Sequence, residues 1–392
     1  MTQQVVVLGA GYAGAGAVKS FEKEIGDTEA ELTWVSEHEY HLVLHEVHRA
    51  IRDPSVESKI ALPISDIKSA ETDFIQGHVK NIDTENRLVE LDERTVEYDY
   101  LLVALGSATA FYGIDGLREH SLTLKSLEDA RTINEQIIAA AQASTQTDPG
   151  QILIGGAGLS GIQAAGEIAE YRDDQNAPIE ITLVEGLDRI FPGQDPEVQG
   201  ALRKRLLEKD INILTGEFIS KVNDETVYLG GGEEEDPQEL VYDVLIWTGG
   251  ITGQEELTDV ELEKNERSNR LFAGTDFQTS DERVFAIGDS ALIDQGTDSV
   301  APPTAQAAWQ AAEVAGENLA RAVRGAPLKS WVHKDKGTVI SVGEKAVAHD
   351  VTGVPLTTFG GPGAKLLKKA IAARWIADVT SAKRAAIAWE SL

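Results

Sequence analysis

The sequence has no cysteine among its 392 residues. Thiolate nucleophiles, disulfide exchange, and zinc or iron–sulfur sites with cysteine ligands are therefore excluded. Enzymes that depend on thiol chemistry are excluded with them. This absence narrows the possible chemistry more than any other feature of the composition.

Long apolar runs are also missing. No stretch approaches the roughly 18 to 20 consecutive apolar residues that a membrane-spanning helix needs. The N-terminus leads directly into a strand pattern, without the basic and then apolar segments of a secretion signal. We therefore expect the protein to stay in the cytoplasm.

Basic residues are scarce, because 35 lysines and arginines face 65 aspartates and glutamates, for a formal net charge of −30. Such a surface repels nucleic acid, whose binding depends on basic groups that neutralise phosphates, so no nucleic-acid partner is expected. It also suits very high salt, where the Debye length falls to about 3 Å and self-repulsion is screened. The charge predicts a halophilic source, with an ordinary acidic protein as the alternative.

A glycine motif near the N-terminus is the first positive signal. The apolar residues 5–8 run into Gly9, Gly11 and Gly14, spaced as G-x-G-x-x-G, and a helix pattern follows over 15–23. The first glycine allows a tight turn, the second lets backbone amides approach a pyrophosphate, and the third lets helix and strand pack closely. The helix N-terminus adds free N–H groups and a positive dipole. The motif predicts a dinucleotide-binding turn; a turn without a ligand is the alternative.

The strand that follows this helix, at 31–35, is succeeded by Ser36 and Glu37. An acid about 20 residues beyond such a turn commonly binds a ribose hydroxyl, which makes Glu37 a candidate. A solvated surface charge is the alternative.

Several histidines come next. On a helix, His41, His45 and His48 would share one face, which raises the possibility of a metal site. No acid in a clear ligand pattern accompanies them, so we expect no metal. The segment is predicted to be a helix beside a cofactor, with some of its histidines simply packed.

The opening pattern occurs a second time over 151–185. A strand, three glycines, a helix and a strand follow one another, with Gly156, Gly158 and Gly161 in the turn and Glu185 at the end of the last strand. Two complete copies are more specific than one and predict two dinucleotide sites. Glu185 favours NADH over NADPH, because an acid binds a free ribose 2′-hydroxyl, although Arg189 nearby offers a partner for a 2′-phosphate.

The remaining elements fit this repeat. Apolar strand patterns near 98–105 and 244–248 each lead to glycine, and Ser126 is a predicted N-cap for a helix over 126–143. Residues 230–239 are predicted to be an exposed acidic hairpin tip. A long alanine-rich helix is predicted over 304–323.

These motifs resemble the two-dinucleotide-binding flavoprotein family and, within it, the type II NADH dehydrogenases. The family pattern rests on the two glycine turns, on A-L-G-S at 104–107 and on F-A-I-G-D at 285–289. The subgroup rests on V-E-Y-D-Y-L-L-V-A-L-G-S ending at 107, on A-Q-A-A-W-Q at 305–310 and on D-K-G at 335–337. The resemblance covers almost the whole chain.

The resemblance implies an α/β fold with two Rossmann-like domains, the NADH domain inserted in the FAD domain, and a small C-terminal region. The FAD domain would comprise 1–115 and 265–325, the NADH domain 116–264, and the C-terminal region 326–392. FAD would bind at the first turn and NADH at the second.

The residues that the motifs and the resemblance indicate fall into three groups. The FAD group surrounds the first turn and consists of Gly9, Gly11, Tyr12, Ala13, Gly14, Ser36, Glu37, His45, Val79, Ala104, Gly106, Gly288, Asp289 and Gln306. The NADH group consists of Gly156, Gly158, Leu159, Ser160, Gly161, Glu185 and Gly249. The catalytic group, near flavin and quinone, consists of Gln306, Gln310, Gln163 and Glu167.

Three positions depart from the family pattern. The usual acid after the second strand is Ser36, with Glu37 one place later. The usual glutamate after the second turn is Gln163, with Glu167 one turn on, and the second glutamine of the usual pair after Gln310 is an alanine. These changes bear on the quinone site and on any glutamate-mediated proton relay.

The charge balance reverses over 363–392, where six basic residues face two acids. The basic residues are Lys365, Lys368, Lys369, Arg374, Lys383 and Arg384. On a helix, an apolar stripe would comprise Leu366, Leu367, Ile371, Trp375 and Val379. A basic amphipathic helix with aromatic residues is typical of a membrane-surface anchor. A helix packed on its own domain, or a homodimer contact, is the alternative.

Together these features predict an FAD-dependent NADH:quinone oxidoreductase of the respiratory chain that does not pump protons. It would be a peripheral protein on the inner face of the cell membrane, with a membrane quinone as electron acceptor. The alternatives are an NADH-dependent reductase of a ferredoxin-type protein and a flavin-binding redox sensor without turnover. The acidic surface disfavours docking of an acidic ferredoxin.

Overall fold

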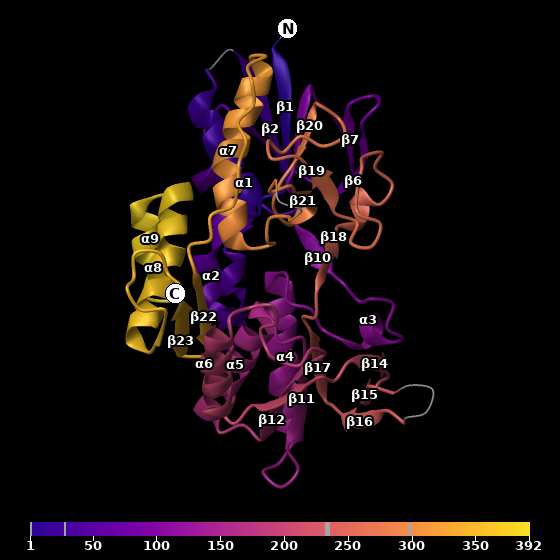
Figure 1. Cartoon of the computed structure of the whole chain (residues 1–392), viewed down its shortest axis with the longest axis vertical. Coiled ribbons are helices and arrows are strands. Elements are labelled where there is room, and N and C mark those ends of the chain that lie inside the picture. The colour runs from indigo at the N-terminus through magenta and orange to yellow at the C-terminus, as the bar shows by residue number, and fades with distance from the viewer. Residues whose placement is uncertain (1, 27–28, 232–235, 297–298) are drawn as a thin grey trace.

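Two parallel sheets organise the chain in the computed structural model, which describes residues 2–26, 29–231, 236–296 and 299–392 (Figure 1). The first sheet has the strand order β20-β9-β1-β2-β5 and is parallel throughout. Its strands are β1 (Gln3–Leu8), β2 (Ala30–Ser36), β5 (Asp73–Gln76), β9 (Tyr100–Val103) and β20 (Val284–Ala286). The apolar end of β1 is fully buried, as expected for a strand covered on both faces.

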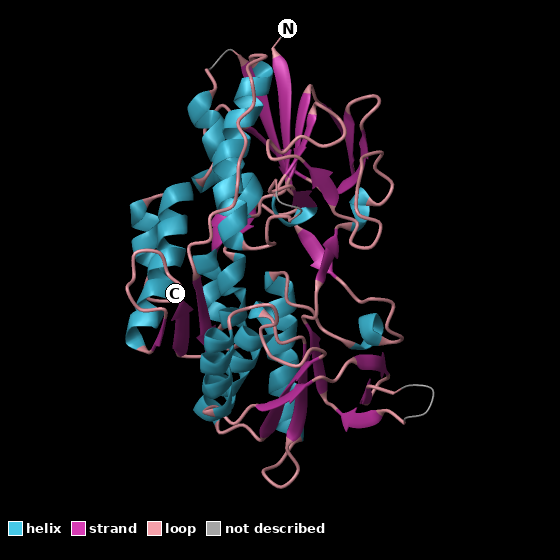
Figure 2. Cartoon of the chain, in the orientation of Figure 1, coloured by secondary structure: helices cyan, strands magenta, loops and turns pink. Residues whose placement is uncertain are grey.

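Helices α1 (Tyr12–Glu24) and α7 (Ala305–Val323) pack together beside this sheet (Figure 2). Two glycines permit the close approach. A Cβ atom at Gly16 would lie 2.7 Å from the Ala312 side chain, and one at Gly316 would lie 2.5 Å from the Ala17 carbonyl oxygen. The predicted helix over 304–323 is confirmed, with Thr304 as its N-cap.

The second parallel sheet has the order β13-β12-β11-β17. Its strands are β11 (Gly150–Gly155), β12 (Ile179–Glu185), β13 (Asn212–Thr215) and β17 (Val244–Trp247). Its helices are α4 (Leu127–Ala143), α5 (Leu159–Gln175) and α6 (Pro196–Leu207). Ser126 caps α4 as predicted, in a reciprocal capping box with Asp129.

The second sheet is inserted within the first along the chain, because β9 precedes it, β20 follows it, and β9 and β20 pair. The chain leaves and returns through β10 (Ser107–Thr109) and β18 (Ile251–Gly253), which pair antiparallel between the two halves (Figure 1). The predicted α/β class with two Rossmann-like units is confirmed by this topology.

Smaller sheets and short helices are attached to the two parallel sheets. Three-stranded antiparallel sheets comprise β6 (Val79–Asp83), β7 (Leu88–Leu91) and β8 (Thr95–Glu97), and β14 (Ile219–Val222), β15 (Thr226–Leu229) and β16 (Gln238–Val241). Two-stranded pairs comprise β3 (Tyr40–Leu42) with β4 (Ala61–Pro63), and β19 (Leu271–Ala273) with β21 (Ala291–Ile293). The short helices are η1 (Leu44–Ile51), η2 (Pro54–Val56), α2 (Glu57–Ile60), η3 (Ile64–Asp66), α3 (Leu117–His120), η4 (Glu255–Leu257) and η5 (Gly288–Ser290). The predicted acidic hairpin tip includes residues 232–235, which lie outside the described residues.

The C-terminal region adds β22 (Thr338–Val342), β23 (Lys345–His349), β24 (Thr358–Gly360), α8 (Pro362–Val379) and α9 (Ala382–Ala388). The apolar stripe expected on α8 is divided between two environments, and the alternative of a helix packed on its own domain holds for part of it. Trp375 and Val379 are buried, whereas Leu366 is 58% exposed and Ile371 is 38% exposed. The apolar residues of α8 therefore divide between an inner face that packs on the protein and an outer face.

No helix within the described ranges is both long enough and apolar enough to cross a membrane.

Candidate functional site

The two glycine turns have the same backbone geometry. Gly9 and Gly156, the first glycines, have φ of 99° and 92°, in the left-handed region that side chains rarely adopt. A Cβ atom on the third glycine, Gly14 or Gly161, would overlap the carbonyl oxygen of the first. Each helix can therefore approach its strand only because glycine stands at this position.

The middle glycines leave room for a ligand. Gly11 and Gly158 are the N-caps of α1 and α5, and a Cβ atom at either would meet nothing within 4 Å. Neither cap has a side-chain hydrogen bond. Each helix thus directs free N–H groups and a positive dipole into open space, which is the arrangement that binds a pyrophosphate.

The neighbouring strand end closes each turn from the other side. A Cβ atom at Gly9 would lie 2.8 Å from the carbonyl carbon of Ala104, and one at Gly156 would lie 2.7 Å from the Cα of Gly249. Gly288, with φ of 67°, comes close to Ala13 of the first turn. The fold thus brings the predicted residues Ala104 and Gly288 to the first turn and Gly249 to the second.

Asp289 lies at the end of the first sheet in a short polar chain. The Ser107 hydroxyl donates to Asp289 Oδ2 at 3.0 Å, and Lys125 Nζ donates to the same hydroxyl at 3.0 Å. Burial lowers the pKa of Lys125, and the nearby Asp289 opposes that shift. Sequence reasoning missed Lys125, which precedes the N-cap of α4 and carries no motif of its own.

The candidate ribose-binding residues at the ends of β2 and β12 differ in their surroundings. Glu37 is exposed, and Ser36 is partly buried. Glu185 is mostly buried, and its two carboxylate oxygens accept the backbone N–H groups of Ala157 at 2.8 Å and Leu187 at 3.0 Å. Glu185 therefore helps to hold the second turn itself.

The predicted helix over the histidines is wrong. His41 lies in β3, which is extended because it pairs with β4, whereas His45 and His48 lie in the 3₁₀ helix η1. His41 bonds to the Ala10 carbonyl and to Trp375. His45 Nδ1 is hydrogen-bonded to the hydroxyl of Tyr12, the first residue of α1.

Among the described residues, the one group with metal-ligand spacing lies elsewhere and comprises Asp195, Glu197 and His349. Both of its carboxylates are exposed, and Asp195 caps α6 by accepting the Glu197 N–H at 2.7 Å. Helix capping accounts for the position of Asp195.

A buried polar cluster joins α5, η1, β22 and α8. Lys368 Nζ donates to Ser341 Oγ at 2.6 Å, and it lies 3.1 Å from His48 Nε2 and 3.5 Å from Glu46 Oε1. Gln163 Nε2 lies 2.9 Å from the same His48 nitrogen. The predicted residue Gln163 thus meets His48 of η1 and Ser341 of β22, both of which also contact Lys368.

Charges in this cluster compensate one another. Burial lowers the pKa of Lys368 to about 8, against the attraction of Glu46. Burial acts to raise the pKa of Glu46, but Lys368 and Arg49 together bring it down to about 2. Burial raises the pKa of Glu167, although Arg52 Nε lies 3.1 Å from its Oε2 atom.

The sequence pattern groups Lys368 with the basic residues of a membrane-surface helix, and this grouping is wrong, since its side chain is only 5% exposed. A usable signal exists. Lys368 lies four residues from Ala364 and from Ala372, and all three are buried. This spacing puts the lysine on the small-residue face of α8.

Both glutamines of α7 hold the segment before β22. Gln306 Nε2 donates to the Gly337 carbonyl at 3.0 Å, and its Oε1 accepts the Lys336 N–H at 2.8 Å. Gln310 binds both backbone groups of Lys334. The two side chains thus fix residues 334–337 against α7.

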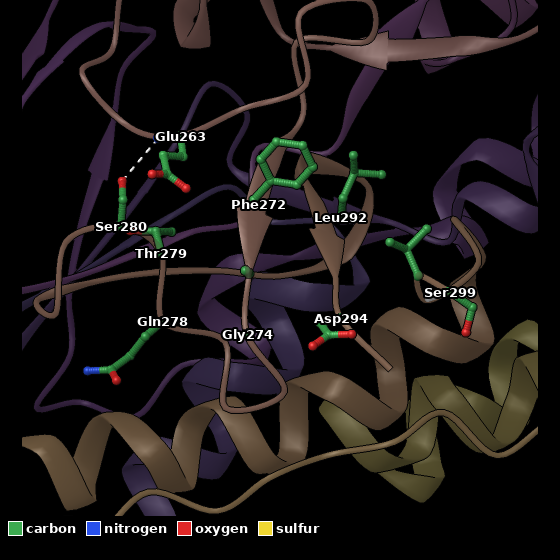
Figure 3. A pocket seen from close by; sticks show the side chains of 11 residues that line it. Glu263, Phe272, Gly274, Gln278, Thr279, Ser280, Leu292, Asp294 and Ser299 are labelled. Atoms are coloured by element: carbon green, nitrogen blue, oxygen red, sulfur yellow. Dashed lines mark hydrogen bonds between the residues drawn. The ribbon is translucent and has the colours of Figure 1, made fainter. Parts of the chain in front are cut away.

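A separate surface cavity of about 390 Å³ lies beside β19 and β21 (Figure 3). Its lining combines apolar side chains such as Phe272 and Leu292 with the acids Glu263 and Asp294. Its lining includes none of the predicted site residues. We assign no dinucleotide to it.

Two parallel sheets, each with a glycine turn between a strand and the helix that follows it (β1 and α1, β11 and α5), define a protein that binds two dinucleotides. The model of the pyridine nucleotide-disulphide oxidoreductase family matches residues 3–312. The chain belongs to this family. Because it has no cysteine, it cannot carry out the disulfide chemistry in the family's name.

Individual relatives extend the match. The type II NADH:quinone oxidoreductase of Staphylococcus aureus (strain NCTC 8325 / PS 47) is 29% identical over 388 residues, which cover 95% of this chain and 94% of that protein. The structure of NDH2 from Plasmodium falciparum in complex with NADH matches with a TM-score of 0.85 at 15% identity, covering 100% and 98% of the two chains. The sulfide:quinone oxidoreductase of Aquifex aeolicus matches with a TM-score of 0.80 at 17% identity, covering 96% and 91%. The two structural matches establish the fold alone.

Proposed function

We propose that the protein is an FAD-dependent NADH:quinone oxidoreductase. The observation that carries the proposal is the pair of matching glycine turns in a chain without cysteine, because electrons must then travel from one bound dinucleotide to the other without a dithiol. The named relative along 95% of the chain supports quinone as the acceptor. When bound, the flavin would accept hydride and pass on electrons. The protein would bind and orient the two dinucleotides and shield them from water.

The first turn fits FAD. The open N-cap at Gly11 offers the N-terminal amides of α1 to the pyrophosphate. Asp289 lies at the end of the same sheet, where its carboxylate would bind hydroxyls of the flavin chain. Ser36, the last residue of β2, and Glu37, the next residue, are the candidates for the ribose, and Val79 is the candidate near the adenine.

The second turn fits NADH. The N-cap at Gly158 is open, and the Glu185 carboxylate is fixed against Ala157 of the same turn. An ionised carboxylate has about four acceptor positions, so two bonds to backbone leave capacity for ribose hydroxyls. Glu185 would thus position the turn and select a nucleotide without a 2′-phosphate.

The C-terminal helices favour contact with a membrane surface. Their exposed apolar side chains are Leu366, Ile371, Ile387 and Trp389, which we call the C-terminal apolar face. Basic side chains accompany them in a chain whose net charge is −30. Apolar residues edged by lysine and arginine are attracted to anionic lipid headgroups. A quinone dissolved in the same membrane would then be within reach.

An acceptor assay tests the proposed activity. Purified protein is mixed with NADH and either a short-chain quinone, a ferredoxin or no acceptor, and NADH oxidation and flavin absorbance are recorded. Rapid oxidation with the quinone alone is expected. Oxidation that needs ferredoxin would overturn the proposal, as would a bound flavin that NADH cannot bleach.

Sedimentation with anionic vesicles tests the membrane contact. Leu366→Glu and Ile387→Glu are expected to reduce the bound fraction and to leave reduction of a water-soluble quinone unchanged. The matched control is Leu207→Glu on α6, where the wild-type leucine is also half exposed. Equal losses of vesicle binding in all three variants would contradict the assignment of this face.

The domain division also belongs to the proposal, with the FAD domain at 1–115 and 265–325, the NADH domain at 116–264 and the C-terminal region at 326–392. The nested strand order supports it. A homodimer stays a prediction, and light scattering on the purified protein checks it.

A further inference from the structure

Helix α8 is joined to the first glycine turn by a buried hydrogen-bonded bridge. Trp375 Nε1 donates to His41 Nε2 at 2.8 Å, and His41 Nδ1 lies 2.7 Å from the Ala10 carbonyl oxygen. Trp375 is 1% exposed and His41 is 0% exposed. The bridge thus connects residues 334 positions apart with a residue of the turn.

The partners of His41 define its tautomer. An indole N–H can only donate, so His41 Nε2 must accept, and a carbonyl can only accept, so Nδ1 must carry the proton. The ring is therefore neutral and has one orientation. Burial lowers the pKa of His41 to about 4, which agrees with this neutral form.

The carbonyl held by His41 controls an amide of the turn. The carbonyl of Ala10 and the N–H of Gly11 belong to one planar trans peptide, in which they point in opposite directions. Fixing the Ala10 oxygen toward His41 therefore directs the Gly11 N–H away from it. A Cβ atom at Gly11 would meet nothing within 4 Å, so there is open space beside this residue.

The Trp375 ring also packs on the start of α1. Its centroid lies 4.8 Å from that of Tyr12, the first residue of the helix. The ring edge lies 3.5 Å from where a Cβ atom at Gly16 would stand. One side chain of α8 therefore contacts the first helical turn and, through His41, the peptide before it.

We propose that His41 and Trp375 are positioning residues for FAD, which hold the Ala10–Gly11 peptide so that its N–H faces the pyrophosphate. The proposal rests on the proposed function only in that FAD occupies the first turn. FAD binding and the seating of α8 are then coupled, and each stabilises the other. Because α8 also carries part of the C-terminal apolar face, the cofactor site and the outer surface share one helix.

Matched tryptophan variants test the bridge in the full-length holoenzyme. Trp375→Phe keeps an aromatic ring but removes the donor to His41. Trp309→Phe makes the same change in a neighbour whose ring lies 4.8 Å from that of Trp375. The dissociation constant of FAD is measured from the fluorescence of flavin released on serial dilution. Trp375→Phe should weaken FAD binding about tenfold, and Trp309→Phe should not.

Two histidine variants separate the halves of the bridge. In His41→Asn the amide nitrogen replaces Nδ1 and still donates to Ala10, whereas in His41→Gln the amide reaches only toward Trp375. The asparagine variant is expected to retain more FAD affinity than the glutamine variant. This order of FAD affinities distinguishes a positioning role from a merely structural one. If His41 only stabilised the fold, the loss of FAD affinity in each variant would follow the fall in the melting temperature of the FAD-free protein.

Three results would overturn the proposal. They are wild-type FAD affinity in Trp375→Phe, equal losses in both tryptophan variants, and better FAD binding by His41→Gln than by His41→Asn. None of these measurements contains a quinone. A failure of the proposed function would instead appear as an inactive wild-type protein with normal FAD affinity, so the two failures are distinguishable.

Discussion

Replacing Gly161 and Gly200 by alanine should change stability in opposite directions, although both residues lie in helices of the same half of the molecule. Gly200 is exposed in α6, and a Cβ atom there would meet nothing within 4 Å. Alanine lowers the cost of ordering a helix backbone, so Gly200→Ala should stabilise by about 0.5–1 kcal/mol. Gly161→Ala brings the same local gain.

The surroundings of Gly161 reverse the sign. The new Cβ atom would overlap the Gly156 carbonyl oxygen and lie 2.8 Å from Thr248 Oγ1, where ordinary contacts begin at 3.4 Å. The obstacle is backbone, so α5 must move away from its strand. Such overpacking costs typically about 1–3 kcal/mol, which leaves a net loss of up to about 2.5 kcal/mol after the helix gain.

Thermal unfolding and NADH kinetics check the pair. Gly161→Ala should lower the melting temperature and raise the KM for NADH about tenfold, because the N-terminus of α5 is displaced from the pyrophosphate. FAD content should stay normal, since the first turn is untouched. A Gly161→Ala protein that is as stable as Gly200→Ala and has an unchanged KM would refute the packing argument.

Further expectations concern the second strand, pH and salt. Glu185→Gln replaces one carboxylate acceptor by an amide donor that faces a backbone N–H. The KM for NADH should therefore rise about tenfold with little change in kcat. Unchanged NADH kinetics would contradict a role of Glu185 in NADH binding. Burial lowers the pKa of His41 to about 4. Between about pH 6.5 and 4 the unfolded chain therefore binds a proton at this residue and the folded chain does not. Stability is lost as the pH falls through this window. The loss for this one group reaches about 3 kcal/mol, and chemical unfolding at pH 7 and pH 5 should show a shallower pH dependence in His41→Asn. With a net charge of −30, the protein should be most active in concentrated KCl, and best activity in dilute buffer would contradict the halophilic prediction.

The sequence by itself determined the two dinucleotide turns and the α/β class. Gly9 and Gly156 have positive φ, and Gly14 and Gly161 have no space for a side chain, so these requirements are local and appear as residue types at fixed spacing. Ser126 was likewise readable as an N-cap, because a cap is satisfied within three residues. Two repeats of such local constraints specify the order of strands and helices.

Only the tertiary structure decided which side chains meet around those turns. The histidine segment forms a strand and a 3₁₀ helix, not the predicted α-helix. Its strand β3 pairs with β4, and the spacing of the histidines does not reveal this partner. Lys368 lies inside because its face of α8 packs on β22 and η1, although the same residue counts as surface charge in the sequence. Trp375 is linked to Ala10 through His41, although Trp375 lies near the C-terminus and Ala10 near the N-terminus. Burial, tautomer and partner depend on which elements pack together, and residues distant in the sequence determine that packing.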